Sequence, residues 1–313
     1  MRFAVNIIVL MSAVTAAAFD SEAWLGKREL LTREAERLQR AYADTSRRID
    51  SPAENVTVPL ESFDDGSVKT SVTAGKAQFF LDTGFVWAEA VVLKTLDGKG
   101  GVDARVDAKN CLVDRSDEAR SGWIEGRARA KHGKMTLEGE SVYLSFAEQY
   151  IAVMSNAVVT ADDLDFGKSK NSGGMVRGRT TLRADRADYD RGEGVIMFDG
   201  NVRLDSKEYN LVADQAFAFV NGTNELRRIV AVGNVAITNG LRSGYCDRTV
   251  YSRYDSKVAM YAGENSPARL MDTDDGRRRE VAGDKITFHL DSEQVEVLRP
   301  VMTVEAGKED FKL

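Results

Sequence analysis

The chain has 313 residues, of which 43% are hydrophobic and 29% are charged, a balance typical of folded proteins and not of disordered ones. Its 4 prolines and 26 glycines exclude collagen-like and proline-rich architectures. A net charge of -6 provides no overall basic field for nucleic acid, and two histidines with two cysteines are a small inventory for metal or nucleophilic chemistry. We therefore expect no enzyme activity, cofactor, metal or nucleic-acid partner, and a function that depends on shape and apolar surface.

The first 18 residues have the pattern of a signal peptide. Arg2 precedes an uncharged stretch from Phe3 to Phe19 that ends in three alanines. We expect cleavage after Ala18 and export of the mature chain. The alternative is a retained inner-membrane anchor, although such a stretch is at the lower limit of length for spanning a bilayer.

Residues 19–52 are predicted to form an amphipathic helix and a linker. Apolar residues recur there at helical spacing, at Leu31, Ala35, Leu38, Tyr42 and Ile49. The pair Ser51-Pro52 should end the helix, because proline cannot continue its hydrogen bonds. The apolar face of this helix either covers the protein's own sheet or docks on a partner.

From residue 56 onward the sequence is typical of β-strands. Short runs rich in valine, threonine and aromatic residues alternate with polar residues and are separated by Asp-Gly and Asn-Gly turns. Seven repeat units are recognised by a small residue, which we call the repeat anchor, at Ala74, Ala108, Gly139, Ala184, Ala213, Cys246 and Gly283.

Five units share apolar or uncharged residues at fixed distances from the anchor. Three and five positions after it stand Ala77 and Phe79, Val142 and Leu144, Ala187 and Tyr189, Thr249 and Tyr251, and Ile286 and Phe288. Twelve and fourteen positions after it stand Val86 and Ala88, Ile151 and Val153, Ile196 and Phe198, Val258 and Met260, and Val295 and Val297. The spacing predicts a hairpin with one apolar face.

One such hairpin cannot bury its apolar face alone, so the units should stack edge to edge into a sheet that folds over this face. The result is an elongated all-β molecule, a β-solenoid, β-jellyroll or V-shaped double sheet, with a long apolar trough. In a regular stack Cys111 and Cys246 would be roughly 40 Å apart. We therefore predict two free thiols and no disulfide.

An acidic residue follows most anchors, at Glu140, Asp185, Asp214, Asp247 and Asp284. We interpret these carboxylates as strand-edge or turn residues. The alternative is a secreted β-solenoid that binds or cleaves polysaccharide, in which a row formed by Asp185, Asp214 and Asp284 does acid-base work. Acidic runs at 162–165 and 272–276 lack the ligand spacing of an EF-hand, so no metal site is expected.

The most family-like residues are Ala184–Asp190, with the sequence ADRADYD, followed by Phe198–Leu204, Leu211–Asp214 and Val232–Ile237. They resemble the OstA-like family of lipopolysaccharide transport proteins, of the LptA type. Residues 56–160 resemble the LptC type more loosely. The expected domains are a signal peptide at 1–18, the helix and linker at 19–52, an LptC-like β-jellyroll at 53–165 and an OstA/LptA-like β-jellyroll at 180–313.

The resemblance implies a periplasmic β-jellyroll whose groove holds the acyl chains of lipopolysaccharide or a similar lipid. It also implies open edge strands that join head to tail with other jellyroll transport components or with a second copy. The expected groove residues are Tyr189, Ile196, Phe198, Val202, Leu204, Phe217, Phe219, Ile229, Val235, Tyr251, Met260, Ile286 and Phe288. A structural scaffold with the same fold and no ligand is a further alternative.

Overall fold

The structure is a computed structural model that describes residues 19–116, 120–169, 174–207, 209–221, 226–240, 242–274, 277–290, 292 and 294–301. The predicted signal peptide lies outside these residues. Among the residues described, no helix is both long enough and apolar enough to cross a membrane. The described chain is one helix followed by antiparallel strands, which confirms the predicted all-β class with one N-terminal helix.

The helix is α2 (Ser21–Ser46), slightly shorter than the sequence predicts. The strands are β1 (Ala53–Ser62), β2 (Val68–Phe80), β3 (Phe85–Leu96), β4 (Val102–Asp114), β5 (Ser121–His132), β6 (Met135–Ser145), β7 (Tyr150–Ser169), β8 (Gly174–Ala184), β9 (Arg186–Asp190), β10 (Val195–Asp205), β11 (Asn210–Val220), β12 (Leu226–Asn239), β13 (Arg242–Ser252), β14 (Lys257–Tyr261), β15 (Ala268–Asp274), β16 (Arg277–His289) and β17 (Val295–Val301).

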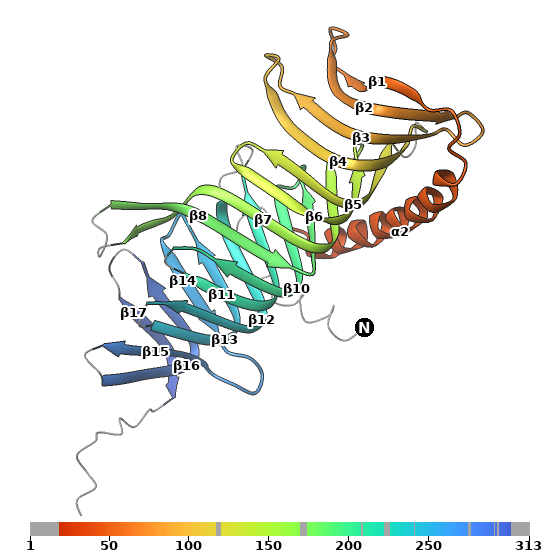
Figure 1. The fold of residues 1–313 in the computed structure, drawn as a ribbon. Helices are drawn as coiled ribbons and strands as arrows, with labels where there is room; N and C mark the ends of the chain where they lie inside the picture. Colours follow the sequence, from red (N-terminus) through yellow and green to blue (C-terminus); the bar gives the residue numbers. More distant parts are fainter. Residues whose placement is uncertain are drawn as a thin grey trace, which may run out of the picture.

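The described strands form one sheet of 17 strands in which chain neighbours pair with one another. β8 and β9 are two halves of one strand, because both lie between β7 and β10, and β14 and β15 are likewise two halves of a strand between β13 and β16. Hydrogen bonding continues from β7 to β8 across the predicted domain boundary, and the division into two units stays a prediction. Figure 1 shows the strands following one another along an elongated molecule, with β1 near one end and β17 toward the other.

A row of bulges crosses the sheet at one level, and we call this row the crease. Pairing shifts there between β4 and β5, between β10 and β11, and between β12 and β13. The crease includes Ala90, Asn156, Asn201, Asn234 and Arg299, all of which have positive φ. Each repeat anchor stands directly before it. The anchors thus mark the place where every hairpin bends, since a bulge bends its strand and increases the local twist.

Glycine is required at the crease by a close approach of a carboxylate. A Cβ built on Gly233 would lie 2.4 Å from Oδ2 of Asp214, and the φ of Gly233 is +79°. The amide of Asn234 donates to the same oxygen at 2.9 Å. Asp214 therefore acts as a turn residue in the way predicted, because its carboxylate stabilises the bulge of β12 through the hydrogen bond from Asn234.

We expect Gly233→Ala to lower the free energy of unfolding by about 1–3 kcal/mol, because alanine adds a clash and a strained φ. Urea denaturation measures this loss. Gly98→Ala is the matched control, since nothing lies within 4 Å of a Cβ there, and it should leave stability unchanged. Equal effects of the two substitutions would contradict the role of the crease.

The crease divides the sheet into two walls that face each other. The first, which we call the helix wall, comprises 76–89, 110–116, 120–125, 140–155, 186–199, 215–221, 226–232, 248–261, 284–290, 292 and 294–298. The second, which we call the free wall, comprises 56–74, 91–108, 127–139, 156–162, 178–184, 202–207, 209–213, 235–240, 242–246, 268–274 and 277–283. One continuous cluster of buried residues, from Val72 to Leu290, lies between them. Cys111 and Cys246 are buried in this cluster as free thiols, as predicted, and burial raises the pKa of each to about 12.

α2 covers the outer face of the helix wall, so the first of its two predicted placements is confirmed (Figure 1). Its N-cap is Asp20, whose side chain accepts a hydrogen bond from the amide of Ala23. Trp24, Ala35 and Leu38 are buried in a second cluster, with Phe80, Trp87, Leu112, Trp123, Tyr143, Tyr150, Ala152, Val195, Met197, Phe217 and Val230. The helix therefore contacts strands from both predicted jellyroll units.

Candidate functional site

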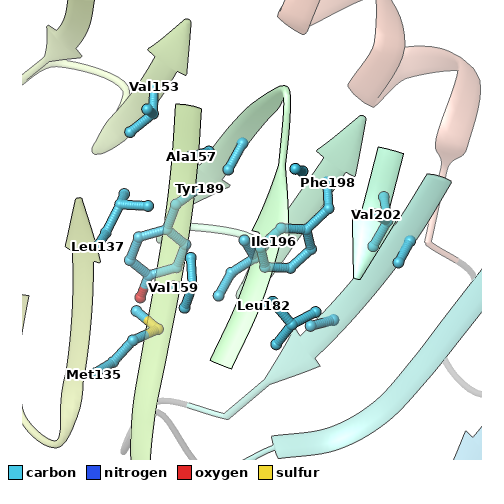
Figure 2. Close-up of a cluster of buried hydrophobic side chains, with 14 of the residues drawn as sticks. Met135, Leu137, Val153, Ala157, Val159, Leu182, Tyr189, Ile196, Phe198 and Val202 are labelled. Carbon is cyan, nitrogen blue, oxygen red and sulfur yellow. The ribbon is translucent and has the colours of Figure 1, made fainter. Parts of the chain in front are cut away.

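The candidate site is the apolar interior between the two walls, which we call the groove. Side chains from the walls meet there: Figure 2 shows Tyr189 of the helix wall pointing toward Met135 and Leu137 of the free wall, with Ile196 and Phe198 beside it. Phe198 and Val202 are fully buried. The groove follows from the repeat, because each hairpin adds apolar residues from two strands at the same levels.

The structure places eleven of the thirteen predicted groove residues in this cluster or packed against it. They are Tyr189, Ile196, Phe198, Val202, Leu204, Ile229, Val235, Tyr251, Met260, Ile286 and Phe288. Two apolar residues of the repeat pattern are not buried in the groove, since Phe79 and Val295 are each 42% exposed. Whether the eleven contact a lipid stays a prediction.

The prediction is wrong for Phe217 and Phe219, because both lie on the face of the sheet opposite the groove. Phe217 is 1% exposed in the cluster under α2, where its ring centroid is 6.2 Å from that of Trp24. The ring centroid of Phe219 lies 5.4 Å from that of Phe19. Pairing between β11 and β12 shifts between Val212 and Gln215, and a one-residue shift moves the following side chains to the other face.

The residues that face the groove on this part of β11 are Ala216 and Ala218. They stand three and five positions after the anchor Ala213, as in the other units. The signal that finds them is the offset from the anchor. The two phenylalanines of β11 pack against α2 instead.

Cavities follow one another along the groove. One of about 10 Å³ lies among β1–β4, one of about 120 Å³ near Leu137 and Tyr189, and one of about 50 Å³ near Ile229 and Tyr251. The largest of these three is smaller than an apolar cavity of about 150 Å³, which is enough for one benzene molecule. The groove is therefore closely packed in this conformation, and the walls must separate before a whole acyl chain can lie between them.

A polar cluster lies at the open side of the groove, where the ends of the two walls meet. Asp103 of the free wall accepts from Arg191 of the helix wall at 2.7 Å and lies 3.1 Å from Nε2 of His132. Burial lowers the pKa of His132 and Arg191 lowers it further, against the opposing effect of Asp103. These three residues were not predicted, because nothing in the sequence relates positions so far apart.

A second polar cluster fastens α2 to the sheet. Arg28 donates to Asp188 and to Asp199, both at 2.9 Å, and Lys27 donates to Asp190 at 3.0 Å. Burial alone would lower the pKa of Arg28, but Asp188 and Asp199 outweigh it and raise that pKa. Asp188 and Asp190 belong to the ADRADYD segment, so part of its acidic character holds the helix in place.

The carboxylate row of the polysaccharide alternative lies along the crease. Asp185, Asp214 and Asp284 are exposed, and each is engaged by the crease residue of the next strand: Asn201, Asn234 and Arg299. Within the described parts of the chain, no three side chains of the His, Cys, Asp and Glu types are grouped to hold a metal ion.

Comparison with known proteins gives a family match and likenesses to solved structures. Residues 181–294 match the family model described as LptA/(LptD N-terminal domain) LPS transport protein. LptH, the LptA homologous periplasmic component of the lipopolysaccharide transport device from Pseudomonas aeruginosa, is similar in structure at 16% identity and a TM-score of 0.33; the match covers 38% of this chain and 82% of LptH. No curated protein matches the chain.

Proposed function

We propose, from the membership of residues 181–294 in the OstA-like family of lipopolysaccharide transport proteins, that this chain is a periplasmic component that carries lipopolysaccharide acyl chains in its groove. The observation that supports this most is the continuity of the buried apolar cluster from β2 to β16. A lipid moving along such a cluster meets similar contacts at each repeat.

The energy of burial is sufficient for this task. An acyl chain gains about 0.8 kcal/mol for each buried methylene, so a chain of about twelve carbons gains on the order of 10 kcal/mol before ordering costs. The free energy needed to separate the walls offsets part of this gain, because the cavities along the groove are small. Transfer then requires the walls to open and close around the chain, with little preference for any one position.

The edges of the sheet provide the contacts with neighbouring proteins. In the described chain, β1 pairs only with β2 and β17 pairs only with β16, which leaves one hydrogen-bonding edge at each end. An unpaired edge is a template for another strand. We expect other jellyroll components, or a second copy of the chain, to join there and to continue the groove.

A photo-crosslinking amino acid tests the lipid. Placed at Phe198, it should capture lipopolysaccharide in the envelope of the native cell, detected as a shifted band that reacts with antibody to the lipid. Arg203 is the matched control, because it lies on the same strand and is exposed between Val202 and Leu204, which face the groove. Capture from position 203 without capture from 198 would count against the proposal, and capture from neither would favour a scaffold without ligand.

A further inference from the structure

The contact between Asp103 and Arg191 crosses the open side of the groove. The pairing of the strands shows this. Asp190 of β9 pairs with Tyr150 of β7, which pairs with Ser145 of β6; Ser145 pairs with Ser121 of β5, and Ser121 with Asp114 of β4. Asp114 and Asp103 lie at opposite ends of β4. A straight strand would separate Asp103 from Asp114 by roughly 36 Å, at about 3.3 Å per residue. Because Arg191 directly follows Asp190 and yet meets Asp103 at 2.7 Å, the fold at the crease brings the two wall ends together.

The cavity of about 120 Å³ lies behind this contact. Its lining includes Leu93, Val106, Leu137, Leu144 and Ile151, together with His132 and Arg191. A second cavity of about 290 Å³ shares His132, Tyr189 and Arg191 with the first and adds Glu193 and Arg227. An apolar inner space and a polar, partly cationic outer space thus meet at the same three residues.

We infer that this place is a side entrance to the groove for a single acyl chain of an anionic lipid, closed by a clasp of Asp103, His132 and Arg191. The inference rests on the proposed function and specifies where the lipid enters. When the clasp opens and the walls separate, the acyl chain enters by way of the inner cavity, while the anionic headgroup replaces Asp103 as the partner of Arg191. The ion pair suits a closure that opens, because the side chains of Asp103 and Arg191 are 27% and 40% exposed and such pairs are weak.

The clasp predicts a change in the rate of lipid binding. The probe is the fluorescent fatty acid cis-parinaric acid, mixed with the full chain in a stopped-flow instrument. Asp103→Asn removes the ion pair and retains the cation that attracts the probe, so the association rate should rise about threefold. The exchange Asp103→Arg/Arg191→Asp restores an ion pair with the same total charge and should return the rate to near that of the wild type.

Asp82→Asn is the matched control, since it removes the same charge from an exposed pair with Arg48 at 2.7 Å, away from the side entrance. Equal rates for Asp103→Asn and Asp82→Asn would overturn the clasp while leaving the proposed function intact. Failure of the wild type to bind the probe, together with no crosslinking from Phe198, would overturn both. Thermal unfolding of each variant establishes that it is folded, and the exchange variant separates loss of the pair from general loosening.

Discussion

Asp188→Ala should lower the free energy of unfolding by about 3–5 kcal/mol. The side chain of Asp188 is fully buried and accepts from Arg28 at 2.9 Å, from Arg186 at 2.6 Å and from the hydroxyl of Tyr150 at 2.9 Å. Its removal leaves the largely buried guanidinium of Arg186 without its carboxylate and that of Arg28 with Asp199 alone, and an uncompensated buried charge costs several kcal/mol. Urea denaturation followed by circular dichroism measures the loss.

A second variant at this position and a control at another separate charge from packing. Asp188→Asn retains the shape and should lose most of the same energy, because the amide cannot neutralise Arg28 and Arg186. Asp82→Ala removes an exposed aspartate and should have little effect. A loss with Asp188→Ala but not with Asp188→Asn would indicate that packing, not charge, fastens α2 to the sheet.

The fold was predictable because its determinant is local and repeated. A small anchor such as Ala184, followed at three and five positions by Ala187 and Tyr189, defines one bend and one apolar face. The sequence therefore predicts the hairpins and the stack. The sequence was less informative about which apolar residues face the groove and which face α2, since large apolar residues occur on both faces, as Phe198 and Phe217 show.

The contacts between distant segments were not predictable from the sequence. Arg28 meets Asp188 and Asp199 only because the first part of the helix lies across β9 and β10, which are about 160 residues away in the sequence. Asp103 meets Arg191 only because the walls fold together at the crease. Neither contact has a sequence signal, since charged residues at these positions are equally typical of a solvated strand. Distances set by the folded sheet decide these contacts.

Phe198→Ala and Met197→Ala should separate the two apolar faces by their response to lipid. The two residues are adjacent on β10 and at most 1% exposed, with Phe198 in the groove and Met197 under α2. Each substitution leaves a cavity in a packed cluster, so we expect losses of about 3–5 kcal/mol for Phe198→Ala and about 2–5 kcal/mol for Met197→Ala. Without lipid, stability alone does not distinguish the faces.

Decanoate below its micellar concentration should distinguish them. If the groove admits an acyl chain, the cavity left by Phe198→Ala is open to it, because an apolar cavity binds apolar groups of matching size. Ligand that binds only the folded state then restores part of the lost stability, about 1–2 kcal/mol relative to wild type at the same decanoate concentration. The cavity of Met197→Ala lies beneath the helix and should recover nothing. Equal recovery in both variants, or recovery in neither, would contradict a groove that takes acyl chains while the outer face stays closed.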